Sequence, residues 1–234
     1  MSDIRLRYQT IEIGDVDIHL CTLRDRQQFD ATDLAAARMG ISSAQWSLFG
    51  VLWPAGEHLA ELMLGENTVG KRILEVGCGI GLASLLLNSR GADISAMDYH
   101  PAAETFLDRN VELNDGDRIP FLRANWENPD TAMGTFDLII GSDLLYEDEH
   151  AADLARFIAR HAAPGARVIL IDPGRGQRGR FASELLQQGF SRLEGPGQAR
   201  PGQERPGQTR SGQAASPDTP AQPESSVLRF LAPL

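Results

Sequence analysis

The central part of the chain alternates short apolar runs with stretches of helical spacing. The apolar runs predict strands at Arg72–Val76, Ala92–Met97, Ile119–Arg123, Phe136–Gly141 and Arg167–Ile171. The stretches with helical spacing lie at Leu82–Ser89, Pro101–Leu113, Asp148–His161 and Phe181–Gln188. Strands that alternate with helices of this length are typical of βαβ units, in which the strands run parallel. The pattern therefore predicts an α/β fold, with a Rossmann-like, doubly wound and mostly parallel sheet.

The N-terminal part has a different pattern. Residues Tyr8–Ile13 and Val16–Leu23 alternate apolar and polar positions on either side of a short turn, which predicts a β-hairpin. Helical spacing follows at Asp33–Met39 and again at Ala55–Leu64. We expect residues 1–52 to form an N-terminal extension made of the hairpin and helical sequence.

The C-terminal part breaks the alternation. Three copies of a Pro-Gly-Gln-x-Arg unit occupy residues 196–210, and polar, Pro-rich sequence continues from there. Such a composition buries too little apolar surface to offset the entropy of ordering it, so residues 195–226 are predicted to be a low-complexity, disordered insertion. A disordered tail would have no need for the apolar segment Val227–Leu231 that follows. We expect this segment to pair with Phe190–Glu194 as the last, antiparallel strands.

This pairing would complete a seven-stranded sheet with an antiparallel last strand. The main domain would then consist of residues 53–194 and 227–234, interrupted by a long surface loop. Such an insertion is tolerated because the entropic cost of closing a loop grows only logarithmically with its length.

Composition and charge narrow the possible partners. The formal net charge is −10, from 22 basic and 32 acidic residues, which argues against a protein that binds the phosphate backbone of nucleic acids. The two cysteines show no metal-type spacing, so we expect no metal, no disulfide and a reducing compartment. The sequence shows no signal-peptide pattern and no apolar run long enough to cross a membrane. We therefore expect a cytoplasmic protein without a membrane or nucleic-acid partner.

A glycine-rich turn follows the first strand of the main domain. Gly77, Gly79 and Gly81 lie between the strand that ends at Val76 and the helix that begins at Leu82. Glycines allow a positive φ and let a ligand approach the backbone, and the free N–H groups of a helix start favour polar ligand groups. The turn predicts a nucleoside-containing cofactor but does not identify it, because dinucleotide-binding proteins use a related pattern.

Two acidic residues help to identify the cofactor. The carboxylate of Glu75, two positions before the first glycine, can accept a hydrogen bond from an ammonium group and would repel a pyrophosphate. This favours S-adenosylmethionine over a nicotinamide or flavin cofactor, as does a glycine spacing that differs from the dinucleotide fingerprint. Asp98 ends the second strand and can accept from two ribose hydroxyls, which fits either kind of cofactor. Alternatively, Asp98 is an ordinary turn residue.

Polar and aromatic residues also follow the third and fourth strands. Asn125 could hydrogen-bond an adenine edge and Trp126 could pack on its face, although Trp126 could equally be a core residue. Asp143 and Tyr146 are three residues apart and could position an amine for attack on a methyl group. In the alternative interpretation, Asp143 caps a short helical turn and Tyr146 packs against it.

Taken together, these segments resemble the seven-β-strand class I methyltransferases that use S-adenosylmethionine. More specifically, they resemble the lysine methyltransferases that carry an Asp-x-x-Tyr signature after the fourth strand. The Trp53–Gly56 and Asp172–Arg175 segments look most like the branch that comprises the methyltransferases of the electron-transfer flavoprotein β-subunit and the bacterial relatives of these enzymes. The resemblance covers roughly Trp53 to Arg175. It rests on four segments: Trp53–Gly56, Leu74–Gly81, Asn125-Trp126 with Phe136–Tyr146, and Asp172–Arg175.

The resemblance implies a function and a set of site residues. It implies methyl transfer from S-adenosylmethionine to a nitrogen nucleophile, with a protein that presents a lysine as the partner. Asp143 and Tyr146 would face the substrate. The cofactor would be bound by Glu75, Gly77, Gly79, Gly81 and Asp98, with Trp53, Asn125 and Trp126 around the adenosine.

Three questions stay open from the sequence. Many relatives have Asp where this chain has Asn125, whose amide oxygen can still accept from the adenine amino group, so we expect a slightly altered affinity. Arg175 could pair with a carboxylate on the acceptor or with Asp143, or it could be a solvated turn residue. The acceptor could also be a small-molecule amine, or the chain could bind S-adenosylmethionine without catalysis.

Overall fold

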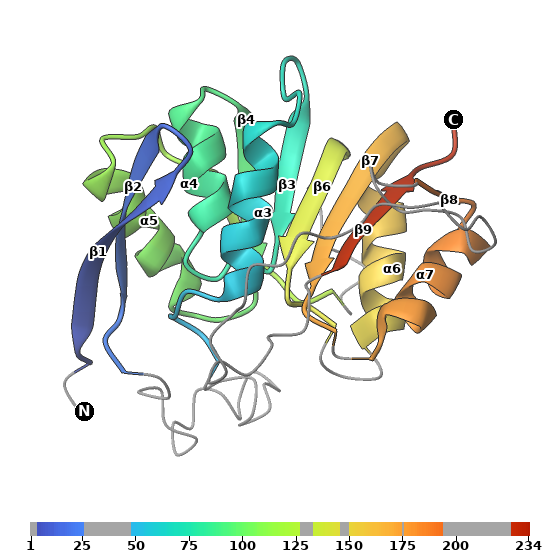
Figure 1. The fold of residues 1–234 in the computed structure, drawn as a ribbon. Helices are drawn as coiled ribbons and strands as arrows, with labels where there is room; N and C mark the ends of the chain where they lie inside the picture. The colour runs from blue at the N-terminus through green and yellow to red at the C-terminus, as the bar shows by residue number, and fades with distance from the viewer. Residues whose placement is uncertain (1–3, 26–47, 127–132, 146–149, 175, 194–225) are drawn as a thin grey trace, which may run out of the picture.

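The computed structural model describes residues 4–25, 48–126, 133–145, 150–174, 176–193 and 226–234. These residues form a central sheet with helices on both faces, and a two-stranded hairpin lies beside it (Figure 1). The seven strands of the sheet are ordered β5-β4-β3-β6-β7-β9-β8. They are β3 (Arg72–Val76), β4 (Asp93–Asp98), β5 (Phe121–Arg123), β6 (Phe136–Ser142), β7 (Ala162–Asp172), β8 (Ser191–Arg192) and β9 (Ser226–Leu231). The predicted Rossmann-like fold is confirmed.

The helices divide between the two faces of the sheet. Helices α3 (Pro54–Leu64), α4 (Leu82–Ser89) and α5 (Ala103–Leu113) contribute to one hydrophobic core, and α6 (His150–His161) and α7 (Arg178–Gln187) contribute to the other. Strand β3 serves both cores, because Ile73 packs into the first and Leu74 into the second. A central parallel strand is buried on both faces, which explains why it reads as a continuous apolar run.

The predicted N-terminal hairpin is confirmed. Strands β1 (Leu6–Ile13) and β2 (Val16–Leu23) pair in antiparallel register from Leu6↔Leu23 to Ile13↔Val16. Strand β2 turns its buried side chains toward the helices, and it lies against α5 at the edge of the molecule (Figure 1). The helix predicted at Asp33–Met39 lies outside the described residues.

The last strands pair as predicted. Strand β9 lies between β7 and β8 and is antiparallel to both, with Ser191 opposite Leu231 and Val168 opposite Phe230. The predicted low-complexity insertion lies outside the described residues except for Ser226. The two chain segments that flank the insertion, β8 and β9, are neighbours in the sheet.

Strand β7 departs from the predicted boundaries. It begins at Ala162 rather than at Arg167, because Ala162 already pairs with Phe136 before the register shifts between Phe136 and Leu138. The irregular stretch contains Gly165, and most of its residues are only partly buried. It therefore does not form an apolar run that would predict a strand. Among the described helices, none combines the length and hydropathy that a membrane-spanning segment requires.

Candidate functional site

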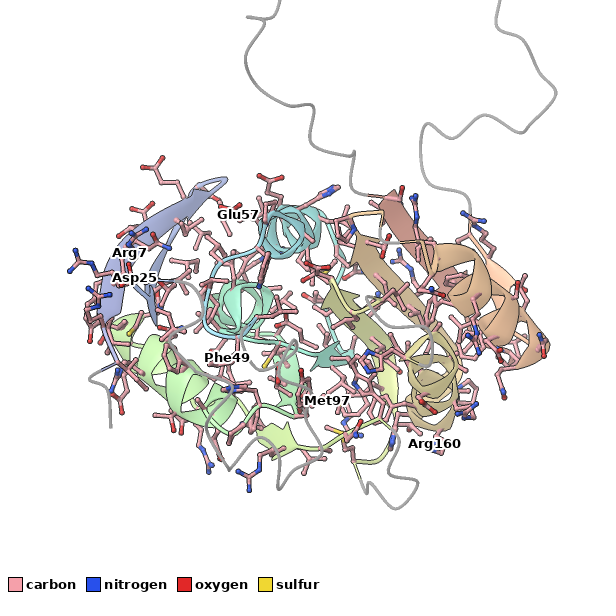
Figure 2. The ribbon with its side chains drawn as sticks, turned by 90° about the horizontal axis from the view of Figure 1, so that it is seen from below. Arg7, Asp25, Phe49, Glu57, Met97 and Arg160 are labelled. Atoms are coloured by element: carbon pink, nitrogen blue, oxygen red, sulfur yellow. The ribbon has the colours of Figure 1, made fainter. Side chains whose placement is uncertain are left out.

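A cavity lies at the carboxyl ends of β3, β4 and β6, where ligands bind in open α/β sheets. Its volume is about 880 Å³, including the solvent at its mouth. Figure 2 views the molecule from this end of the sheet and shows Phe49, one of the lining residues, near the middle. Seven predicted site residues line it: Trp53, Glu75, Gly77, Gly79, Asp98, Trp126 and Asp143.

The other three predicted site residues are placed differently. Gly81 is the N-cap of α4 and does not line the cavity. Asn125 is exposed and does not line it either, although it directly precedes Trp126, which does. Tyr146 lies outside the described residues, as does Arg175.

The three glycines of the turn have separate roles. All three have positive φ, at 62° for Gly77, 56° for Gly79 and 83° for Gly81, a conformation that residues with a Cβ rarely adopt. A Cβ on Gly77 would lie 2.4 Å from Leu144 Cδ2, and one on Gly81 would lie 2.4 Å from Leu107 Cδ1. A Cβ on Gly79 would meet no atom within 4 Å. Gly79 is therefore the glycine that leaves the backbone accessible from the cavity.

Asp98 is held by backbone amides. Its Oδ2 accepts a 2.8 Å hydrogen bond from Gly79 N, and its Oδ1 accepts one of 2.8 Å from His100 N. Burial raises the pKa of this carboxyl group, and the hydrogen bonds from backbone N–H groups act in the opposite direction. The carboxylate thus holds the glycine turn as well as lining the cavity.

Glu75 connects β3 to the start of α4. Its Oε2 accepts a 2.9 Å hydrogen bond from Ser84 N and a second hydrogen bond from the Ser84 hydroxyl group. The side chain is buried, and the loss of hydration raises its pKa to about 7, with a smaller contribution from the nearby charge of Asp98. A cation in the cavity would favour the ionised form of Glu75.

Aromatic rings form part of the cavity wall. Phe49 stacks on His100 with 4.0 Å between ring centroids, and Trp53 Nε1 donates a 3.2 Å hydrogen bond to Leu48 O. Burial lowers the pKa of His100 to about 3, so this ring is neutral at physiological pH. The sequence analysis missed Phe49 and His100. The only signal for His100 was its position two residues after Asp98, and Phe49 belongs to no predicted element.

Asp143 has an unusual backbone conformation. Its φ is 55°, in the left-handed region, and its amide donates a 2.9 Å hydrogen bond to Ile171 O. This bond extends the ladder between β6 and β7 one residue beyond the end of β6. Such conformations cost energy and cluster at functional sites. The chain is bent at the point where Asp143 meets the cavity.

The charges of the cavity favour a cationic ligand. Glu75, Asp98 and Asp143 line it, and the described lining residues include neither lysine nor arginine. A polyphosphate would therefore meet carboxylates without a compensating positive side chain. Within the described part of the chain, no group of three or more His, Cys, Asp or Glu side chains is arranged to hold a metal ion.

Known proteins resemble this chain in sequence. Residues 38–182 match the family model described as lysine methyltransferase. The electron transfer flavoprotein beta subunit lysine methyltransferase of Rattus norvegicus is 31% identical over 167 residues, which cover 70% of this chain and 62% of the rat protein. The calmodulin-lysine N-methyltransferase of Arabidopsis thaliana is 29% identical over 136 residues, which cover 53% of this chain and 45% of the plant protein.

A solved structure supports the fold. The 16S rRNA N2 G1207 methyltransferase of T. thermophilus superposes with a TM-score of 0.62 at 17% identity, over 97% of this chain and 51% of that protein. At this identity the likeness concerns the fold alone. The match to the rat protein leaves more than a third of that relative's length uncovered. The family model covers more than half of this chain, and the chain belongs to the lysine methyltransferase family.

Proposed function

We propose that this protein transfers a methyl group from S-adenosylmethionine to a nitrogen atom, and that the acceptor is a lysine side chain of another protein. One observation carries the proposal. In a fold of the lysine methyltransferase family, a single cavity joins the glycine turn at Gly79, the carboxylate of Asp98 and the strained residue Asp143.

The cavity fits the proposed cofactor. S-adenosylmethionine, when bound, supplies a methyl group activated by a positively charged sulfonium, and its amino acid part carries an ammonium group. The accessible backbone at Gly79 allows the close approach that a bound nucleoside needs. Glu75 and Asp98 provide negative charge for a cationic ligand. We assign the adenosine to the neighbourhood of Trp53 and Trp126, which both line the cavity, with Asn125 preceding Trp126 in the chain.

The chain's residues would act mainly by positioning the acceptor. An amine must lose its proton before its lone pair can attack, and a carboxylate at the cavity wall can accept a hydrogen bond from that amine and orient it. Asp143 is the residue we assign to this task, and we propose that Tyr146, three positions later in the chain, assists it. Orientation of the amine toward the methyl group can account for much of the rate enhancement.

The relatives favour a protein acceptor. By their names, the rat relative acts on lysine of the electron transfer flavoprotein β-subunit and the plant relative acts on lysine of calmodulin. We therefore propose a folded protein as the partner of this chain. The cytoplasm is the compartment we propose for the reaction, and the two buried free cysteines, Cys21 and Cys78, support a reducing environment.

The experiment is to incubate the protein with S-adenosylmethionine labelled on the methyl group and with a lysate of cells that lack the protein. Labelled protein bands are then digested, and mass spectrometry locates the methylated side chain. We expect methyl-lysine in one or a few proteins, and much less label with the Asp98→Asn variant at a concentration of S-adenosylmethionine that does not saturate it. Label only in small molecules would overturn the protein acceptor. Binding of S-adenosylmethionine without any transfer would favour a non-catalytic protein.

A further inference from the structure

The side chain of Asn110 connects the N-terminal hairpin to the glycine turn. Asn110 lies on α5 and is completely buried. Its Oδ1 accepts a 2.7 Å hydrogen bond from Cys21 N in β2, and its Nδ2 donates a 3.0 Å hydrogen bond to Ile80 O in the turn. The oxygen and the nitrogen of one side-chain amide therefore connect β2 and the glycine turn, which are far apart in the sequence.

The turn needs such an external contact. Ile80 lies between Gly79 and Gly81, both at positive φ, and it is one of the residues that line the cavity. Glycine has the largest conformational freedom of any residue, so these positions do not hold the turn in place by themselves. The hydrogen bond to Asn110 fixes the direction of the Ile80 carbonyl group, and with it the peptide plane that Ile80 shares with Gly81.

A second asparagine provides a natural comparison. Asn114, at the C-terminal end of α5, accepts a 2.8 Å hydrogen bond from His19 N and donates one of 2.7 Å to His19 O. Asn110 and Asn114 are four residues apart, which corresponds to about 6 Å along a helix, and two residues of a strand span about 7 Å. The two amides can therefore hydrogen-bond alternate residues of β2. Asn114 thus holds the hairpin and does not contact the turn.

We propose that Asn110 is a positioning residue for the cofactor-binding turn, which it holds through its hydrogen bond to Ile80 O. The cofactor part of this inference rests on the proposed function. The buried side-chain amide of Asn110 has a partner for both its acceptor oxygen and its donor nitrogen. If the donor is lost, Ile80 O loses this partner and the turn is free to adopt other conformations.

The test compares Asn110→Asp with Asn114→Asp. Aspartate at position 110 still accepts from Cys21 N, and at a pH high enough to ionise it in its buried position it cannot donate to Ile80 O. The same substitution at position 114 removes the hydrogen bonds that Asn114 Nδ2 donates to His19 O and to Asn110 O, and it leaves the bond from Asn110 Nδ2 to Ile80 O in place. The first measurement is hydrogen exchange in the ligand-free protein at the amides of Cys78, Gly79 and Gly81, each of which donates a hydrogen bond. We expect exchange about tenfold faster in Asn110→Asp and near parental rates in Asn114→Asp.

The second measurement is calorimetric titration with S-adenosylmethionine, followed by kinetics. For Asn110→Asp we expect the Kd and the KM for S-adenosylmethionine to rise about tenfold while kcat stays within about threefold of the parent. For Asn114→Asp we expect a Kd within about twofold of the parent. If a carboxylate at position 110 prevents folding, Asn110→Ser, whose hydroxyl is too short to reach both partners, should show the same pattern.

Equal effects of the two substitutions on exchange in the turn, or no effect of either, would overturn the inference about Asn110. Faster exchange in Asn110→Asp with an unchanged Kd would overturn the link to cofactor binding. A parent protein that does not bind S-adenosylmethionine at all would count against the proposed function, and the exchange measurement would still decide whether Asn110 positions the turn.

Discussion

The backbone amide of Gly79 donates a 2.8 Å hydrogen bond to Asp98 Oδ2, so the glycine turn after β3 is tied to the end of the neighbouring strand β4. The other carboxylate oxygen of Asp98 accepts from His100 N. One buried carboxylate therefore shapes the turn on one side and the start of the loop after β4 on the other. Both segments line the cavity. The two hydrogen bonds of Asp98 therefore stabilise the fold and shape the cavity at the same time.

Replacing Asp98 by Asn should weaken both the turn and cofactor binding. An amide has one acceptor oxygen, so its NH₂ group would face one of the two backbone donors. Hydrogen bonds that involve a charged group contribute about 1.5–3 kcal/mol. We expect the melting temperature to fall by several degrees and the Kd for S-adenosylmethionine to rise roughly 10–100-fold, measured by calorimetry. Asp93→Asn, at the exposed start of the same strand, should change neither. Parental affinity in Asp98→Asn would contradict this role.

Gly79→Ala should remove cofactor binding out of proportion to its effect on stability. The positive φ of Gly79 costs a residue with a Cβ about 1–2 kcal/mol, and the added methyl group would project into open space at the cavity. Gly91 is a matched control, since its φ is 70°, a Cβ there also meets no atom within 4 Å, and it does not line the cavity. Both variants should lose similar stability in thermal unfolding, and only Gly79→Ala should lose affinity. Equal affinities of the two variants for S-adenosylmethionine would show that the ligand does not approach Gly79.

The stability of the ligand-free protein should depend on pH through Glu75. Burial raises the pKa of Glu75 from 4.5 to about 7, so between these pH values the folded protein keeps a proton that the unfolded chain releases. The contribution of this group is fully present below pH 4.5 and is lost as the pH rises through about 7. Glu75→Gln cannot ionise, and we expect it to be more stable than the parent at pH 8, by on the order of 2 kcal/mol, but not at pH 4.5.

The same substitution should weaken the binding of a cationic cofactor, because the negative charge is lost. Urea unfolding at several pH values and calorimetric titration at pH 8 measure the two effects. Glu61→Gln, on the exposed side of α3, should change neither quantity. A Glu75→Gln variant that is less stable than the parent at pH 8 would show that Ser84 requires the ionised carboxylate.

Asp143→Asn should separate catalysis from folding. Asparagine tolerates the left-handed conformation that Asp143 adopts at φ 55°, whereas alanine does not. We expect Asp143→Asn to keep the melting temperature within about 2 °C and the Kd for S-adenosylmethionine within about threefold, while methyl transfer falls by about 100-fold. Asp143→Ala should lose about 1–2 kcal/mol of stability in addition. Unchanged transfer in Asp143→Asn would remove Asp143 from the proposed mechanism.

Residues 195–225 should be removable without loss of the fold. Strands β8 and β9 pair directly, and Leu193 N donates a 2.9 Å hydrogen bond to Arg229 O, so a short Gly-Ser linker can replace the insertion. Each halving of a loop's length changes the closure entropy by only about 0.6 kcal/mol, and we expect a melting temperature within a few degrees of the parent. A chain that stops at residue 225 should not fold stably, because it loses Phe230, which is completely buried. A large fall in melting temperature on removing the insertion alone would contradict the prediction.

The pattern of apolar runs and helical stretches was enough to predict most strands and helices, and the edge of the sheet at which the cavity lies. Apolar runs and helical spacing predicted the strands and helices because period and burial are local properties of a chain segment. The glycine turn could be placed for the same reason: strand, turn and helix are consecutive, and parallel strands bring their carboxyl ends to one edge. The pairing of β8 with β9 was predictable because an apolar segment after a polar insertion has to be buried somewhere in the fold.

Which groups meet at that edge and around it follows from the tertiary structure and could not be predicted from the pattern. Cys21 and Asn110 are 89 residues apart, and nothing in the pattern around either residue indicates their hydrogen bond. The stack of Phe49 on His100 and the left-handed conformation of Asp143 were equally hidden. Hydrogen bonds and ring contacts of this kind depend on the relative placement of whole elements to within an ångström or less. Local periodicity carries no information on that placement, because it arises from the packing of all the elements together.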